Sequence, residues 1–240
     1  MSNYYPPHTP AFDDTFQNMI RNLAVHIVKE HLSDHNAQVV GLGSGSTVAV
    51  LLREIARLTD KNTTEFVATS LQIKKEAENN GLIIVDESKI PSTNIVIDGA
   101  DQVDSKFYMI KGGGGALLKE KVLICAARRV IIVADSNKFV NKFSRAIPIE
   151  VHPFARSIVG IKLREIGGIP SLRTIEKGYP FITESGNIIL DTSFHSLSDI
   201  PSTEINLRNI PGVLEVGLFT RRADVYYKAN SDGSFETITY

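Results

Sequence analysis

A run of four glycines at 112–115 separates Lys111 from an apolar segment that contains Glu120. Because glycine has no side chain, such a run lets the backbone approach a ligand closely. A flexible linker has the same composition, but a linker is not expected between a predicted strand and an apolar helix. A carboxylate in a partly desolvated pocket can act as a general base, and a nearby ammonium stabilises negative charge on a substrate oxygen. The segment therefore predicts an acid–base site with Lys111 and Glu120.

A second glycine-rich segment, Gly-Leu-Gly-Ser-Gly-Ser-Thr at 41–47, follows an apolar run and precedes a helical pattern. Backbone N–H groups and the positive end of a helix can bind a phosphate there, and the hydroxyl groups of Ser44, Ser46 and Thr47 add donors. The spacing is not G-x-G-x-x-G, no acid closes the next strand and there is no P-loop lysine, so dinucleotides and NTPases are disfavoured. The segment predicts a site for a small phosphorylated or carboxylated ligand, with a tight packing turn as the alternative.

Two acids, Asp98 and Asp101, directly follow another apolar run, and Asp-Ser-Asn-Lys at 135–138 follows the next one. In an open parallel sheet, ligands collect beyond the carboxyl ends of the strands. These side chains are therefore expected at one edge together with the glycine-rich segments. The alternatives are an Asx turn with solvated carboxylates and, for Lys138, a solvated loop lysine.

Composition and charge exclude several classes of protein. There are 26 lysines and arginines against 27 aspartates and glutamates, which lacks the basic excess of a protein bound to nucleic acid or to an anionic membrane. No apolar stretch approaches the ~20 residues of a membrane helix. The polar, proline-rich start of the chain lacks the pattern of a signal peptide. We therefore expect no nucleic-acid or membrane partner and a cytoplasmic location.

The remaining candidates for chemistry carry less weight. Cys125 is the single cysteine, which excludes a disulfide framework, and its apolar neighbours predict a place in the core. His31 and His35 are four residues apart at a predicted helix end, without a third ligand nearby, so no metal site is expected.

The elements that must position these residues alternate along the first part of the chain. Apolar residues at helical spacing predict helices at 16–28, 46–58, 71–79 and 116–127. Short apolar, β-rich runs predict strands at 37–42, 65–68, 82–85, 94–97 and 130–134. Helices alternating with such strands indicate an α/β fold with a mostly parallel sheet covered on both faces.

After residue 147 the pattern changes to that of a smaller α+β unit, which we place at 149–217. The segment 147–151 leads to a helix at 157–166, and the unit also contains a hairpin around Ser185 and Gly186 and a helix at 202–209. A second hairpin is predicted at 223–240. Residues 1–148 and 218–240 then form the larger domain.

In this order, the segments resemble the type A ribose-5-phosphate isomerase family. The resemblance rests on the motifs at 43–47, 98–101, 111–121 and 134–138, is supported by those at 147–151, 183–187 and 210–219, and extends from residue 16 onward. It implies a Rossmann-like sheet domain with a smaller ferredoxin-like domain. It also implies a homodimer or homotetramer that interconverts ribose 5-phosphate and ribulose 5-phosphate in the pentose phosphate pathway, without metal or cofactor.

The resemblance also assigns roles by position. Glu120 matches the general base that moves a proton between C2 and C1 through a cis-enediolate, and Lys111 matches the lysine that stabilises the enediolate. Asp98 and Asp101 match acids that handle ring opening and hydroxyl protons. The matched substrate-binding residues are Ser44, Gly45, Ser46, Thr47, Asp98, Gly99, Ala100, Asp101, Lys111, Gly112, Gly113, Gly114 and Lys138.

The chain departs from the family pattern at three positions. Gln102 stands where the family usually has Glu, which removes a charge near the site. Ser44 replaces Thr and keeps the hydroxyl, and Lys119 replaces Arg and keeps the charge. Two other readings stay open: another sugar-phosphate reaction, such as deamination or lactone hydrolysis, and a non-catalytic sugar-phosphate-sensing domain.

Overall fold

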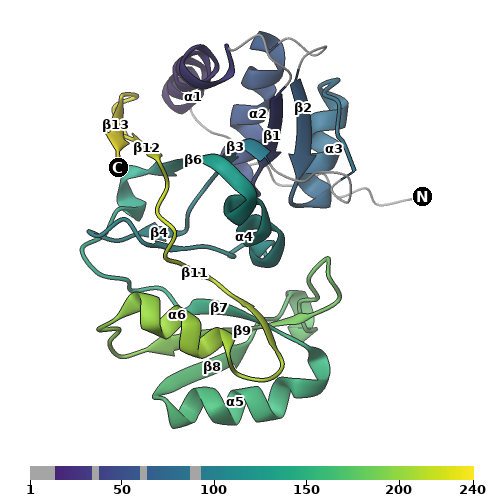
Figure 1. Cartoon of the computed structure of the whole chain (residues 1–240), viewed down its shortest axis with the longest axis vertical. Helices are drawn as coiled ribbons and strands as arrows, with labels where there is room; N and C mark the ends of the chain where they lie inside the picture. Colours follow the sequence, from purple (N-terminus) through teal and green to yellow (C-terminus); the bar gives the residue numbers. More distant parts are fainter. Residues whose placement is uncertain (1–13, 34–37, 60–63, 87–92) are drawn as a thin grey trace.

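The computed structural model describes residues 14–33, 38–59, 64–86 and 93–240. Its largest sheet has six strands in the order β13-β12-β6-β3-β1-β2, and only β13 runs antiparallel to its neighbour (Figure 1). The strands are β1 (Gln38–Leu42), β2 (Thr64–Ala68), β3 (Thr93–Asp98), β6 (Ala127–Asp135), β12 (Val225–Ala229) and β13 (Phe235–Thr239). The predicted parallel sheet is therefore confirmed.

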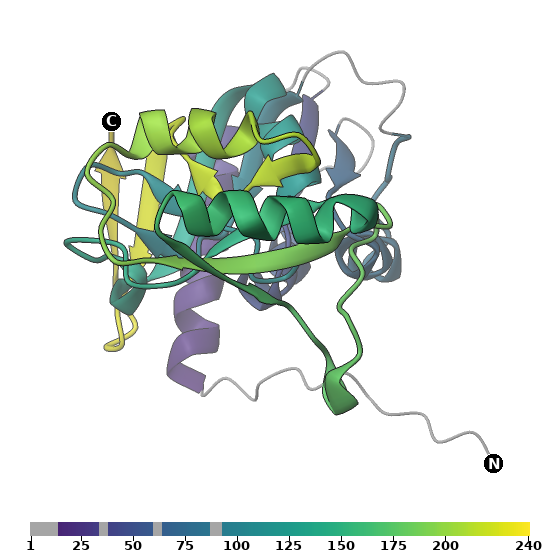
Figure 2. The same cartoon turned by 90° about the horizontal axis from the view of Figure 1, so that it is seen from below.

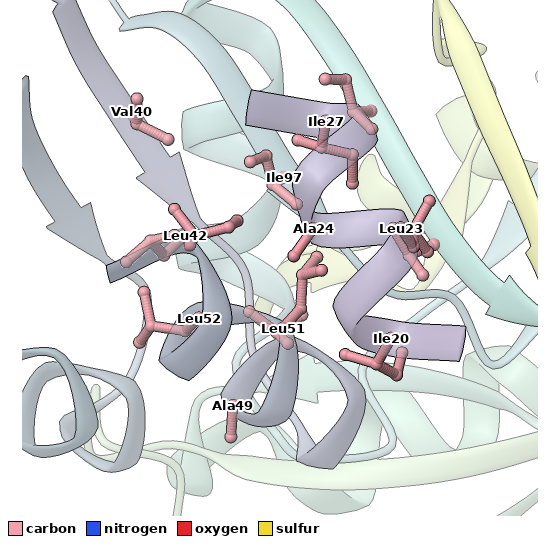
Figure 3. Packing of buried hydrophobic residues seen from close by; sticks show 14 of the residues in the cluster. Ile20, Leu23, Ala24, Ile27, Val40, Leu42, Ala49, Leu51, Leu52 and Ile97 are labelled. Atoms are coloured by element: carbon pink, nitrogen blue, oxygen red, sulfur yellow. The ribbon is translucent and has the colours of Figure 1, made fainter. Parts of the chain in front are cut away.

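Helices cover both faces of this sheet because its central strands are apolar on both sides. In β3, Ile97 packs into one buried cluster and its neighbour Val96 into the other, as successive strand side chains point to opposite faces. The first cluster holds side chains of α1 (Asp14–Ile27), α2 (Ser46–Leu58) and α3 (Leu71–Asn79), and Figure 3 shows how α1 and α2 pack there. The second cluster holds α4 (Leu117–Ala126). A π-helix, Val28–Leu32, continues α1.

A second sheet has four antiparallel strands in the order β10-β7-β9-β8. Along the chain these elements are β7 (Ile147–Val151), α5 (Arg156–Glu165), β8 (Gly168–Leu172), β9 (Ile188–Phe194), α6 (Ile200–Arg208) and β10 (Val213–Val216). This is the βαββαβ arrangement of a ferredoxin-like unit. Figure 2 shows α5 and α6 side by side in front of the strands.

Three short strands join the two sheets. The order β11-β5-β4 brings β11 (Leu218–Phe219), on the path back from the four-stranded sheet, against β5 (Met109–Ile110), which pairs with β4 (Gln102–Val103). Lys111 follows β5 directly, so this small sheet fixes where the glycine run begins. The strand expected before the glycine run is β5, for which the sequence pattern gave no bounds; β4 was not predicted, and each of the two has only two residues.

Some predicted elements are wrong. No strand forms at 82–85; a single parallel bridge joins Ile84 to Phe66. The turn at Ser185 and Gly186 forms, but its first arm makes only an isolated bridge between Ile182 and Ile188. The C-terminal hairpin is confirmed as β12 and β13.

The core position predicted for Cys125 is also wrong, because its side chain is exposed. It lies on the outer face of α4 together with Val122, one turn earlier. Within the described ranges, no helix is both long and apolar enough to cross a membrane.

Candidate active site

The carboxyl ends of the central parallel strands surround a pocket of about 140 Å³. Four loops contribute to it, and each one follows a strand of the sheet or of the small sheet beside it. This is the edge at which open parallel sheets bind ligands. The lining residues are Ser44, Gly45, Ser46, Thr47, Gly99, Ala100, Asp101, Lys111, Gly113, Gly114, Glu120 and Lys138.

The turn between β1 and α2 is shaped by two glycines. A side chain at Gly43 would place its Cβ 1.8 Å from Oδ1 of Asp98, so only glycine fits beside this carboxylate. Gly45 has φ +95° and ψ 173°, a conformation that is essentially restricted to glycine. Gly45 caps α2 without a side-chain hydrogen bond, and Gly45, Ser46 and Thr47 line the pocket, so the N-terminal end of this helix is available there to bind an anion.

Lys111 is buried between two carboxylates at the floor of the pocket. Its Nζ lies 2.8 Å from Oδ2 of Asp98 and 3.3 Å from Oε2 of Glu120, and it donates to the carbonyl of Gly99 at 2.6 Å. Asp98 also accepts from the backbone N–H groups of Gly99 at 2.7 Å and Ser44 at 3.3 Å. One ammonium and two carboxylates therefore share a site that is almost closed to water.

This arrangement perturbs both partners of the closest ion pair. Burial and the negative charge of Glu120 raise the pKa of Asp98 to about 7, against the opposing effect of Lys111. Burial favours the neutral form of Lys111, but the charges of Asp98 and Glu120 outweigh it and raise the pKa of Lys111 to about 12. Lys111 is therefore a permanent cation, and Asp98 is able to hold or release a proton near neutral pH. Perturbed groups of this kind cluster at functional sites.

Glu120 enters the pocket from the first turn of α4. Its Oε1 accepts a hydrogen bond of 2.5 Å from the hydroxyl of Ser44, while its Oε2 faces Lys111. The side chain is only 3% exposed. The carboxylate is thus held at both oxygens, at Oε1 by a hydrogen bond and at Oε2 by an ion pair.

Asp101 and the glycine run hold each other in place. Oδ2 of Asp101 accepts from the N–H of Gly113 at 2.8 Å, and a Cβ at Gly113 would lie 2.8 Å from Oδ1 of the same carboxylate. The run is also tied to the four-stranded sheet: Nη1 of Arg173 donates to the carbonyls of Gly112 at 2.8 Å and Gly113 at 3.1 Å. Asp191 fixes Arg173 in turn through two hydrogen bonds.

Lys138 closes the pocket from the opposite side. It ends a 3₁₀ turn, Ser136–Lys138, that follows β6, and its side chain is partly exposed. Its Nζ is 3.8 Å from Oδ2 of Asp135, a loose ion pair that leaves the ammonium free to meet an anion. The pocket therefore has a cation at its mouth and a cation at its floor.

The structure brings almost all of the predicted site residues together. Asp98 and Gly112 are the exceptions among the described residues, because neither lines the pocket. Asp98 lies behind Lys111, and Gly112 has φ +100° and packs against Leu117 and Pro148. The sequence reasoning missed Arg173, since its link to the glycine run spans about sixty residues and has no local pattern.

Two of the departures from the family pattern have structural explanations. Gln102 is buried, donates to the hydroxyl of Ser144 and accepts from the N–H groups of Ser144 and Arg145. It therefore fastens the loop before β7 and does not line the pocket. Lys119 makes an exposed ion pair of 3.0 Å with Glu184.

None of the histidines that the structure describes lines this pocket. Nε2 of His31 lies 2.9 Å from the hydroxyl of Tyr227, and burial lowers the pKa of His31 to about 4. His35 lies outside the described residues. In the parts of the chain that the structure describes, no three His, Cys, Asp or Glu side chains form a group able to hold a metal ion.

Comparison with known proteins agrees with this geometry. The family model described as ribose 5-phosphate isomerase A (phosphoriboisomerase A) matches residues 65–233. The chain is 39% identical to ribose-5-phosphate isomerase A of Methanosarcina acetivorans over 207 residues, which cover 85% of this chain and 88% of the relative. It is 40% identical to the protein of the same name from Haloarcula marismortui over 200 residues, covering 82% and 87%.

Solved structures give the same result. The ribose 5-phosphate isomerase A of Methanocaldococcus jannaschii aligns with a TM-score of 0.83 and 30% identity, over 95% of this chain and 99% of that one. A D-ribose-5-phosphate isomerase in complex with phospho-erythronic acid aligns with a TM-score of 0.84 and 29% identity, over 93% and 98%. The parallel sheet, the ferredoxin-like unit and these matches over most of the chain together show that it belongs to the ribose 5-phosphate isomerase A family.

Proposed function

We propose that the pocket interconverts D-ribose 5-phosphate and D-ribulose 5-phosphate, with Glu120 as the general base. The observation that carries this proposal is the placement of the Glu120 carboxylate, 3.3 Å from the buried Lys111 ammonium in a pocket that also holds a helix N-terminus and Lys138. Family membership supports it, and so does the relative of similar structure that binds phospho-erythronic acid, a phosphorylated sugar acid.

The reaction moves one proton between adjacent carbons. Glu120 takes the proton from C2 of the open-chain aldehyde, and the electron pair forms a C1–C2 double bond while the aldehyde oxygen becomes an oxyanion. Lys111 stabilises this cis-enediolate because its ammonium is fixed at the floor of the pocket and cannot be neutralised near pH 7. Asp101 carries the proton of the C2 hydroxyl to the oxygen on C1. Glu120 then returns its proton to C1, and the oxygen on C2 becomes the ketone.

The two aspartates have different roles in the reaction. Asp101 lines the pocket, so we assign it the ring opening and the hydroxyl protons of the substrate. Asp98 does not line the pocket and acts through Lys111, which it holds at 2.8 Å. Asp98 thus serves the enediolate indirectly, by keeping the ammonium under the reacting oxygens.

The phosphate is placed away from this chemistry. The N–H groups at the start of α2, the hydroxyls of Ser46 and Thr47, and Lys138 together provide donors and positive charge for it. These contacts are the same in the aldose and the ketose. They therefore keep the substrate in position and bind the aldose and the ketose equally.

Glu120→Gln tests the central assignment. The amide keeps the shape of the side chain but cannot take a proton, so turnover should fall by about 10²–10⁴-fold while the fold and substrate binding are retained. Ribulose 5-phosphate formation is measured with a chelator present, and in D₂O the wild type should place deuterium at C1 of the ketose. Glu236→Gln, in an exposed ion pair with Lys228, is the matched control.

The assay gives a different result for each alternative function or mechanism. Near-normal turnover by Glu120→Gln removes Glu120 from the base role. Binding of ribose 5-phosphate without conversion by the wild type supports the sugar-phosphate sensor instead. Activity that is lost with the chelator contradicts the metal-free mechanism.

Three further parts of the prediction are also proposed on the basis of the family resemblance. The chain is expected to assemble as a homodimer or homotetramer, which sedimentation would resolve, and to act in the cytoplasm. We also propose two domains, one of residues 1–148 with 218–240 and one of residues 149–217. The four-stranded sheet supports this division, since its strands lie between Ile147 and Val216.

A further inference from the structure

The chain passes between the two sheets twice, and both passages meet at the backbone of Lys111. Gly217 lies on the return path; its carbonyl accepts from the N–H of Lys111 at 2.9 Å, and its N–H donates to the carbonyl of Pro148, on the outward path, at 2.7 Å. A Cβ at Gly217 would lie 2.4 Å from the carbonyl oxygen of Lys111. We call the contact of these three residues the crossing. It leaves no room for a side chain.

Lys121 reaches the crossing from α4. Its Nζ donates to the carbonyls of Val216 at 2.6 Å and Leu218 at 2.7 Å, which flank Gly217 on both sides. It also donates to Glu204 of α6 at 2.6 Å and to Glu215 of β10 at 2.9 Å. The side chain is 6% exposed. One ammonium thus links α4 to α6 and to the backbone on both sides of Gly217.

Lys121 lies outside the substrate pocket, although it is the residue next to the proposed base. Consecutive side chains on a helix point in directions about 100° apart, so α4 turns Glu120 toward the pocket and Lys121 toward the crossing. Any shift of α4 relative to the crossing moves Glu120 relative to Lys111. The contacts of Lys121 oppose such a shift directly.

The ion group of Lys121, Glu204 and Glu215 is not explained by stability alone. Burying one ammonium and two carboxylates carries a desolvation cost, and well-packed apolar residues often stabilise a protein as well or better. What the ion group adds is a fixed arrangement. The three N–H groups of the ammonium are shared among four acceptors at 2.6–2.9 Å, so each element that carries an acceptor is held close to α4. The acceptors of Lys121 belong to α6, to β10 and to the backbone around Gly217. The position of α4 relative to these elements determines where Glu120 lies in the pocket.

We propose that Lys121 is a positioning residue for the isomerisation. By clamping α4 to the crossing, which also holds the backbone of Lys111, it maintains the 3.3 Å separation between Glu120 and Lys111. This inference rests on the proposed function. A displacement of about 1 Å at a reacting group can cost about 100-fold in rate, so the contribution of Lys121 should show in kcat.

The decisive variant removes the whole charge group and keeps its volume: Lys121→Met with Glu204→Gln and Glu215→Gln. It leaves no unpaired charge, unlike Lys121→Met alone. Folding is followed by urea unfolding, and kcat and KM are measured with ribose 5-phosphate well below the unfolding transition. Lys119→Met, two residues away on the same helix in an exposed ion pair, is the control.

We expect the triple variant to fold, with kcat lower by about 10–100-fold and KM within threefold, because the proposed phosphate donors belong to the start of α2 and to the segment after β6, not to α4. A folded triple variant with wild-type kcat overturns the positioning role, as does a triple variant that cannot fold, which would assign the group to folding alone. An inactive wild type would overturn the proposed function instead, so the two failures are distinguishable.

Discussion

Replacing Lys111 by Met should destabilise the protein because two buried carboxylates lose their cation. The ammonium lies 2.8 Å from Asp98 and 3.3 Å from Glu120. At an effective dielectric constant of about 20, each contact contributes roughly 5–6 kcal/mol of Coulomb attraction before the cost of desolvation. Breaking one side of a buried ion pair costs about 3–5 kcal/mol in net terms, and we expect a loss in unfolding free energy of that size at pH 8.

The loss should depend on pH in a defined direction. The pKa of Asp98 is about 7 in the folded protein and 3.8 for the free side chain. Between these values the folded state holds a proton that the unfolded chain has released, so the contribution of Asp98 to stability falls as pH rises through this window. Without Lys111 the two carboxylates can approach neutrality only by binding protons. The difference between variant and wild type should therefore be smaller at pH 5 than at pH 8.

Urea unfolding followed by far-UV circular dichroism measures both effects. With a slope of about 3 kcal/mol per M, the midpoint at pH 8 should fall by about 1–1.7 M. Lys119→Met serves as the control, because its exposed ion pair contributes at most about 1 kcal/mol. Adding Asp98→Asn to Lys111→Met should recover part of the loss. A Lys111→Met protein as stable as the Lys119→Met control at pH 8, or equally destabilised at both pH values, would refute the reasoning.

Two further predictions concern the turn before α2. Ser44→Ala removes the hydroxyl that donates to Glu120 at 2.5 Å; hydrogen bonds to charged groups contribute about 1.5–3 kcal/mol, so kcat should fall roughly 10–150-fold. Ser44→Thr, which keeps the hydroxyl, should stay within threefold in the same assay, and equal losses in both variants would contradict this role. Gly43→Ala places a Cβ 1.8 Å from Asp98 and should lower the thermal midpoint clearly, because overpacking costs about 1–3 kcal/mol or more. Gly114→Ala, whose Cβ meets only Ser44 Oγ at 3.5 Å, should melt like the wild type, and similar midpoints for the two variants would show that Gly43 is not sterically required.

The pocket was accessible to sequence reasoning because its residues come in short segments after apolar strands. In a parallel sheet the ends of such strands must meet at one edge, so local motifs are enough to place Glu120 near Asp101 and Lys138. The same reasoning failed for Cys125, because charged and apolar residues of α4 occur on several sides of the helix and its pattern does not reveal which face is covered. The predicted strand at 82–85 failed because its pairing is limited to one bridge at Ile84.

Long-range contacts could not be predicted from local sequence patterns. Lys121 is buried by Glu204 and Glu215, which are 83 and 94 residues away. Arg173 is tied to the glycine run across 60 residues or more. Nothing near these positions distinguishes a buried lysine or arginine from a solvated one, because the partners that compensate the charge are set by the tertiary fold.

The position of Gly217 affects when the active site can form during synthesis of the chain. Lys111 and Glu120 are synthesised about a hundred residues before the return strand that holds them, and β12, which completes the parallel sheet beside β6, comes later still. Contacts of such large sequence separation form late, because the chain between them must be ordered first. During translation the acid–base groups are therefore not held in place until β11 and β12 have been made, and the nascent protein gains its chemistry only after these strands emerge.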